Sequence, residues 1–315
     1  MTASEPLWPA AVSERAATLV HGPARSAKVL GTFPTALYLQ VGGHARVLPV
    51  VTPDGLRLPT ALAVATSLPR VGWGVQPGDD VVVGGGDVLL PGVTIRAVRT
   101  WHPRRVPTAS VATFLGAPLA PLALPWRAAS RVLTQGLTGD ERSLPSRVQE
   151  LVGRGPGLTP SGDDVLCGVM LALRLHPRGS DVLLGRLWRA VRPLLATTTS
   201  LSAALLTEAA RGYAVAPVVR LTEALAGADR AAPTGSARLT GETGPAGSTL
   251  PDEVAAAIRE VLAIGHSSGA DLLGGLAGCL DALDALDEAD SADLLGAPDL
   301  LVHSGRPAMT PRSLQ

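Results

Sequence analysis

The sequence predicts an α+β fold, in which a small N-terminal β-barrel or sandwich precedes a mainly α-helical domain. From Ser26 to about Arg104, short runs rich in valine, leucine and threonine are broken by glycine and proline, a pattern typical of short strands joined by turns. From about Ser110 onward, apolar residues recur at helical spacing in longer segments rich in alanine and leucine. A chain of 315 residues that is 46% hydrophobic can bury the core that such a fold requires.

We expect the β-rich domain to occupy residues 1–108. Its strands are predicted from "AKVLGTFPTALYLQVGG", "ARVLPVVTPDGLRLP", "DDVVVGGGDVLLPG" and "VTIRAVRTW", with turns at "TPDG" and "QPGDD". The glycine run in "VVVGGGDV" follows a strand, but strand-like residues resume after it. It therefore lacks the helix that a dinucleotide-binding fingerprint requires.

The helical domain is predicted over residues 109–296. Its clearest helices are "VLCGVMLALRL", "SDVLLGRLWRAVRPLLA", "SLSAALLTEAARGYA", "APVVRLTEALAG", "PDEVAAAIREVLAIG" and "ADLLGGLAGCLDALDAL". Residues 227–250 are small and polar and offer little to bury, so we expect a mobile loop there. Similar composition predicts a flexible tail over residues 297–315.

Composition argues against several classes of partner and compartment. The 27 basic and 27 acidic residues cancel, which argues against nucleic acid or an anionic membrane as a partner. Lys28 is the only lysine, so an anion site would be built from arginine or backbone N–H groups. Cys167 and Cys279 lie on apolar helical faces and predict buried thiols. With no signal peptide or membrane-spanning run in the sequence, we expect a cytoplasmic protein.

Two predicted helices begin with the same pattern, Ser-Gly-x-Asp followed by apolar residues and a glycine. "SGDDVLCGVMLAL" and "SGADLLGGLAGCL" align as Ser161 with Ser268, Gly162 with Gly269, Asp164 with Asp271, and Gly168 with Gly275. A purely structural interpretation makes each serine a helix cap and each aspartate a capping-box acid. The later glycine would then let another helix approach closely.

A functional interpretation starts from the residues before each serine. Three glycines precede the first helix in "GRGPGLTP", and His266 precedes the second. Helix N-termini expose unpaired N–H groups, so two starts that face each other would form an anion pocket. The substrate-binding candidates are Gly157, Thr159, Ser161, Gly162, Ser267, Ser268, Gly269 and Asp271, and Ser200 in "TTTS" could join them.

The stretch from Gly157 to Gly162 has the spacing of a phosphate-binding loop, but Asp163 and Asp164 stand where that loop has lysine and serine or threonine. An ordinary nucleotide loop is therefore not expected. The two aspartates either act as caps or bind a divalent cation such as Mg²⁺ or a substrate amide. Asp163 has no acidic counterpart in the second copy, where Ala270 stands, so it is the preferred candidate for chemistry.

"GLTPSGDD", "TTTSLSAALLTEAARG" and "GHSSGADLLGGL", in this order over roughly residues 150–280, resemble the AllH-like family. Its namesake is the third subunit of oxamate carbamoyltransferase in allantoin catabolism, part of purine degradation. The resemblance implies a transferase role in the phosphate-dependent cleavage of oxalurate to oxamate and carbamoyl phosphate, with other protein subunits required. Ala270 stands where such motifs often carry a bulkier residue, which leaves the substrate open.

Such a reaction needs an anion cradle, a donor for the developing oxyanion and an acid for the departing nitrogen. His266 could supply the proton, while Asp163 and Asp164 could hold the carbamoyl NH₂ group or Mg²⁺. Two alternatives remain: a non-catalytic partner subunit that binds a small anion, and a stand-alone lyase or hydrolase for a small carboxylated substrate.

Overall fold

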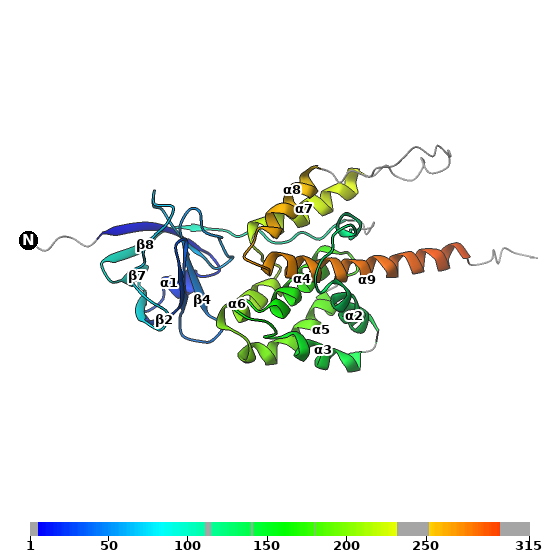
Figure 1. The fold of residues 1–315 in the computed structure, drawn as a ribbon, viewed down its shortest axis with the longest axis horizontal. Helices are drawn as coiled ribbons and strands as arrows, with labels where there is room; N and C mark the ends of the chain where they lie inside the picture. The colour runs from blue at the N-terminus through cyan, green and yellow to red at the C-terminus, as the bar shows by residue number, and fades with distance from the viewer. Residues whose placement is uncertain (1–5, 111–114, 140, 180, 232–251, 297–315) are drawn as a thin grey trace, which may run out of the picture.

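Eight strands between residues 7 and 101 close into a barrel, shown in blue to cyan in Figure 1. The computed structural model describes residues 6–110, 115–139, 141–179, 181–231 and 252–296. The strands are β1 (Leu7–Ser13), β2 (Arg25–Phe33), β3 (Ala36–Gln40), β4 (Val47–Val51), β5 (Leu62–Val64), β6 (Asp80–Gly84), β7 (Asp87–Leu90) and β8 (Val93–Trp101), with the short helix α1 (Ala17–Val20) after β1. The barrel, and with it the α+β class, confirms the prediction.

The strand order around the barrel is β1-β5-β4-β3-β2-β6-β7-β8. Most neighbours are antiparallel, whereas β1 with β8 and β4 with β5 run parallel. Alternate residues point into a core that includes Val29, Leu37, Leu48 and Ile95, all almost fully buried. The glycine run of "VVVGGGDV" is the tight β6–β7 turn, and its three glycines at 84–86 all have positive φ.

Helices fill the rest of the described chain. They are α2 (Arg127–Thr138), α3 (Leu144–Leu151), α4 (Ser161–Leu175), α5 (Asp181–Val191), α6 (Ser200–Ala209), α7 (Ala216–Ala231), α8 (Asp252–Leu262) and α9 (Ser268–Gly296). Short 3₁₀ turns occupy Ala117–Leu119, Glu141–Ser143 and Arg192–Thr197. Among the described residues, no helix is both long and apolar enough to cross a membrane.

Helix α7 corrects one boundary of the sequence prediction. Residues 227–231 of the predicted loop are helical, because α7 continues through Ala231. A helical pattern that ends in small residues gives no sharp stop signal, which is why composition placed the boundary too early. Residues 232–251 and the predicted tail at 297–315 lie outside the described residues.

The two central helices, α4 and α9, pack against each other over a long contact (Figure 1). Every residue of α4 between positions 162 and 173 is buried, so this helix forms the centre of the helical core. Cys167 on α4 and Cys279 on α9 are buried free thiols, as the sequence predicted. The two helices therefore form the scaffold on which both repeated motifs lie.

The barrel is tied to the helices by polar contacts as well as by packing. Arg15 makes a two-pronged ion pair with the buried carboxylate of Glu208 on α6, at 2.7 and 3.0 Å. Ser200 at the start of α6 donates to the Gln40 side chain at 3.1 Å and lies 3.1 Å from the His44 ring. These contacts attach the barrel to both ends of α6, since Ser200 is its first residue and Glu208 lies next to its last.

Candidate functional site

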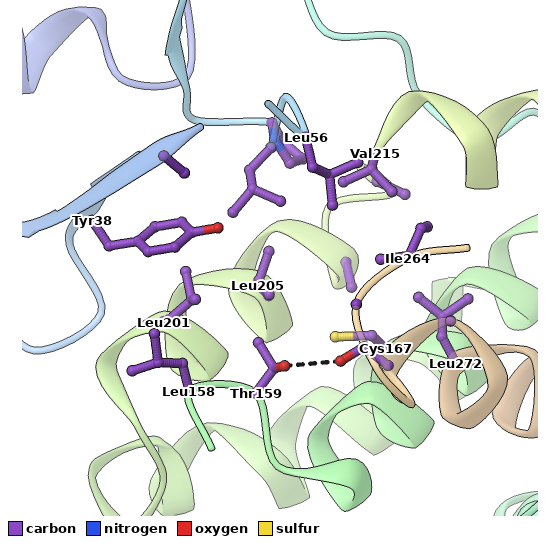
Figure 2. A pocket seen from close by; sticks show the side chains of 18 of the residues that line it. Tyr38, Leu56, Leu158, Thr159, Cys167, Leu201, Leu205, Val215, Ile264 and Leu272 are labelled. Carbon is purple, nitrogen blue, oxygen red and sulfur yellow. Dashed lines mark hydrogen bonds between the residues drawn. The ribbon is translucent and has the colours of Figure 1, made fainter. Parts of the chain in front are cut away.

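The structure brings the two Ser-Gly-x-Asp helix starts side by side. The hydroxyl oxygens of Thr159, before α4, and Ser268, the first residue of α9, lie 3.0 Å apart (Figure 2). Since the two helices start at the same place and pack along their length, they run parallel. The two motifs therefore meet, although more than a hundred residues separate them in the sequence.

The similarity between the two motifs extends to the helix and loop that precede each of them, α3 before α4 and α8 before α9. After α3, the Arg154 N–H donates to the Leu151 carbonyl at 3.0 Å, and after α8 the Ile264 N–H donates to the Val261 carbonyl at 3.0 Å. The carbonyls of Arg154 and Ile264 then accept from the amides of the motif glycines at 162 and 269, at 2.9 and 3.1 Å. The repeated unit is thus helix, loop and helix, with a longer loop in the first copy.

Glycine is required at both repeated positions because backbone atoms come too close for a side chain. A Cβ at Gly162 would lie 2.0 Å from the Leu151 carbonyl oxygen, and one at Gly269 would lie 1.9 Å from that of Val261. Further along, a Cβ on Gly168 would lie 2.1 Å from the carbonyl oxygen of Leu272. The sequence interpretation that Gly168 lets another helix approach closely is confirmed.

Gly275, the equivalent of Gly168 in the second copy, approaches the backbone of the other helix equally closely. A Cβ on Gly275 would lie 2.1 Å from the carbonyl oxygen of Val165. Val165 and Leu272 are themselves equivalent positions in the alignment, so each helix uses its glycine against the same point of the other. The α4–α9 pair is therefore related by an approximate twofold axis that runs along the two helices.

The serine-capping interpretation is wrong for α4. Pro160 occupies the N-cap position and Ser161 is the first helical residue, with no side-chain cap hydrogen bond. The Gly162 N–H, which could have faced an anion, instead donates to the carbonyl of Arg154. The same holds for Gly269 and Ile264, so two of the predicted amide donors are already used inside the protein.

Asp163 is buried and its two carboxylate oxygens are engaged. One accepts from the Gly153 N–H at 2.9 Å, and the other accepts a short hydrogen bond from the Thr198 hydroxyl. Burial raises the pKa of Asp163, while the hydrogen bonds from Thr198 and Gly153 oppose the rise. These contacts join the loop before α4 to the loop before α6, where the Thr199 side chain caps the helix by accepting from the Ser202 N–H.

Asp164 and Asp271 occupy equivalent places in the two copies, and both are buried. In the part of the chain that the structure describes, one oxygen of each carboxylate has no hydrogen-bond partner. Burial raises the pKa of Asp164 to about 7, against the lowering effect of the Ser268 and Thr159 hydroxyls. The nearby charges of Asp271 and Asp163 raise it further, so Asp164 holds a proton for part of the time near neutral pH.

A cavity of about 380 Å³ opens between the barrel and the helices, beside the Thr159–Ser268 pair (Figure 2). This volume lies within the range of small-molecule sites. The helical side contributes Cys167, Leu201, Leu205 and Leu272, and the loop before α9 contributes Ile264 and Gly265. The cavity is the place where the repeated motifs, α6 and the barrel all meet.

The barrel supplies the opposite wall. Phe33 and Tyr38 from the β2–β3 hairpin pack edge to face, with ring centroids 5.8 Å apart, and Leu56 and Leu58 come from the loop between β4 and β5. Figure 2 shows the Tyr38 ring reaching from β3 towards α6 with its hydroxyl in the cavity. Burial raises the pKa of Tyr38, so its hydroxyl remains protonated.

The candidate residues divide into two groups. Thr159, Ser268 and Gly269 line the cavity. The remaining candidates do not line it: Gly157, Ser161, Gly162, Asp163, Asp164, Ser200, His266, Ser267 and Asp271. His266 and Ser267 are exposed, and Ser200 faces Gln40 and His44 of the barrel. Their roles in binding or catalysis remain predictions.

Sequence reasoning missed the barrel wall, above all Tyr38. A single tyrosine in a strand carries no motif, and nothing in its neighbourhood indicates which helix it will face. Tyr213, which contributes to the same cavity and stacks under Arg15 at 4.7 Å, was missed for the same reason. An available signal is that tyrosine is rare here, with only these 2 in the chain.

No set of three or more histidine, cysteine, aspartate or glutamate side chains is placed to hold a metal ion among the residues that the structure describes. Asp163 uses its oxygens on Gly153 and Thr198. The described geometry therefore adds no support for the Mg²⁺ interpretation of Asp163 and Asp164.

Residues 151–245 match the family model described as oxamate carbamoyltransferase subunit AllH. This segment contains "GLTPSGDD" and "TTTS", and the match confirms the resemblance that these motifs indicated. The barrel and the second motif, at residues 265–271, lie outside the matched segment. No solved structure matches the chain.

Proposed function

We propose that the chain is a subunit of a carbamoyltransferase and that the cavity between barrel and helices holds the carbamoyl group of its substrate. The observation that carries this proposal is the position of the cavity: its polar edge is formed by Thr159 of the matched segment and by Ser268 of the repeated motif. The reference reaction is the cleavage of oxalurate by phosphate to oxamate and carbamoyl phosphate.

In this reaction a phosphate oxygen forms a bond to the ureido carbonyl carbon of oxalurate. The bond from that carbon to the amide nitrogen breaks, and the nitrogen takes up a proton to give oxamate. The hydroxyls of Thr159 and Ser268 would orient the carbamoyl group by hydrogen bonds. Asp164, close to both hydroxyls and with a pKa of about 7, is better placed than the exposed His266 to hold a proton for this site.

The anionic parts of the substrates need other partners. Within the described part of the chain, no arginine, lysine or histidine lines the cavity. Arg15 and Arg105 lie over the ring of the lining residue Tyr213, and Arg15 is already paired with Glu208. Binding of phosphate or a carboxylate in the cavity would require basic residues from elsewhere. We therefore propose that other subunits complete the site, and that the complex acts in the cytoplasm, where the buried thiols stay reduced.

The proposal is tested by assembling the full chain with co-expressed partner subunits and measuring carbamoyl phosphate formed from oxalurate and phosphate. The variant Thr159→Val with Ser268→Ala should lower kcat/KM about tenfold or more, because two hydrogen bonds of about 1 kcal/mol each are lost. Ser146→Ala, which removes an exposed hydroxyl on α3, is the matched control and should leave the rate unchanged.

Two outcomes would favour other functions. A complex that forms carbamoyl phosphate equally well with the double variant would place the chemistry on another chain and leave this chain a non-catalytic partner. Turnover of a small carboxylated compound by the purified chain alone would indicate a stand-alone lyase or hydrolase.

A further inference from the structure

The walls of the cavity differ from what a small carboxylate such as oxalurate, which carries one negative charge, requires. Leucine, isoleucine and valine side chains from α4, α6, α9 and four loops cover most of its surface, and Phe33 and Tyr38 close it on the barrel side. Among the described residues that line it, none is aspartate, glutamate, lysine, arginine or histidine. An anion placed there would lose its hydration without gaining an opposite charge.

The hydroxyl-bearing residues of the lining are Thr159, Ser268 and Tyr213 on the helical side and Thr35 and Tyr38 on the barrel side. On the helical side the Thr159 and Ser268 hydroxyls lie 3.0 Å apart, so at most one of them donates to the other. On the barrel side the Tyr38 hydroxyl makes no hydrogen bond to any other described residue. These groups can both donate and accept, which suits an uncharged head with N–H and C=O groups.

The buried aspartates near the Thr159–Ser268 hydroxyl pair also favour an uncharged ligand head. Asp164 is 6% exposed and has one oxygen without a partner in the described residues. Asp163 and Asp271 lie near it, so the potential on this side is negative when any of the three is ionised. Such an environment favours ligand N–H donors and disfavours carboxylate or phosphate.

From these observations we infer that the cavity binds a compound with an uncharged ureido or amide head and a hydrocarbon body, and that Tyr38 is a specificity-determining residue for its head. This inference rests on the proposed function only for the carbamoyl nature of the head. Oxalurate remains the reference donor for the assembled complex, and N-carbamoyl compounds with apolar substituents are the class that this chain itself selects.

The experiment is isothermal titration calorimetry of the full chain with four probes: methylurea, butylurea, cyclohexylurea and N-carbamoylglycine. Affinity should rise from methylurea to butylurea by roughly threefold for each added methylene group, as burial of hydrocarbon predicts. Cyclohexylurea should bind at least about tenfold more tightly than N-carbamoylglycine, which carries the same head with a carboxylate.

Two variants separate the head from the body. Tyr38→Phe should weaken all three alkylureas by a similar factor of about five, while the ratio between butylurea and methylurea stays the same. Leu89→Ala, on the outer face of the barrel, is the control. It should change neither the affinities for the alkylureas nor the ratio between butylurea and methylurea. An affinity that does not depend on the length of the hydrocarbon, tighter binding of N-carbamoylglycine, or no binding of any alkylurea would overturn the inference.

These results are independent of the test of the proposed function. Carbamoyl phosphate formed from oxalurate by a complex whose isolated chain binds no alkylurea would leave the function standing and refute the inference. Binding of the alkylureas by the chain, with no carbamoyl phosphate formed by the complex, would support the inference and refute the proposed function.

Discussion

Replacing Asp164 by asparagine should stabilise the protein at high pH and change little at low pH. The pKa of this buried carboxyl rises from 3.8 to about 7 on folding. At about 1.4 kcal/mol per pKa unit, ionising it in the folded state costs on the order of 4 kcal/mol. Because the folded pKa is the higher one, this cost is absent below pH 3.8, grows between about pH 4 and 7, and is complete above pH 7.

The measurement is urea-induced unfolding of the wild type and Asp164→Asn at pH 5 and pH 8. The gain in free energy of unfolding caused by the substitution should be about 2–3 kcal/mol larger at pH 8 than at pH 5. The other acids close to Asp164 are Asp163 and Asp271, and both remain in the variant. Asp54→Asn, at an exposed position, is the control and should show the same small effect at both pH values.

The reasoning would be refuted by an Asp164→Asn effect that is equal at pH 5 and pH 8. It would also be refuted by a loss of stability that grows with pH, since that result would mean that the ionised carboxylate has a stabilising partner. In either case Asp164 could not serve as the proton-holding group beside Thr159 and Ser268, and the assignment of the proton would have to move to another group.

Two further predictions concern the scaffold. Gly168→Ala should lower the free energy of unfolding by about 2 kcal/mol, because the clash with the α9 backbone outweighs the roughly 1 kcal/mol that alanine gains in a helix. Gly185→Ala on α5, where nothing lies within 4 Å, should stabilise the protein slightly in the same denaturation assay. Thr198→Val should lower the free energy of unfolding by about 1–3 kcal/mol, because it leaves an oxygen of Asp163 buried without its hydrogen-bond donor. The control, Thr197→Val at the neighbouring exposed position, should lower it by about 0.5 kcal/mol or less. Equal changes in the free energy of unfolding for the two glycine variants would contradict the packing argument. Equal losses for the two threonine variants would contradict the hydrogen-bond argument.

Much of the fold could be predicted because the local pattern and the tertiary environment agree. Strands such as β2 and β6 alternate between buried and more exposed residues, and the turns carry glycine and proline where the backbone requires them. The close approach of α4 and α9 was also readable, because a glycine recurs at the same place in two similar helix starts. Nothing else in a buried apolar helix would favour glycine, which lowers helix stability.

The site was only partly predictable, and the reason is physical. Ser-Gly-x-Asp marks a helix start, but the direction of each side chain depends on what packs against it. Asp163 looked the more chemical of the two aspartates because it lacks a counterpart, yet its oxygens are used by Gly153 and Thr198. Hydrogen bonds between segments many residues apart cannot be read from spacing.

The cavity lies where the approximate twofold symmetry of the α4–α9 pair is broken. Two equivalent helix–loop–helix units would form a symmetric pair on their own, with Asp164 and Asp271 in matching places near the axis. The symmetry is broken by the longer loop in the first copy, by Asp163 in place of Ala270, and by the barrel wall that carries Tyr38. The repeated half supplies the close-packed scaffold and the hydroxyl pair, and the parts that do not repeat decide what binds. Substitutions at the non-repeated positions should therefore change which ligand binds, while those at the repeated glycines should change whether the helices pack at all.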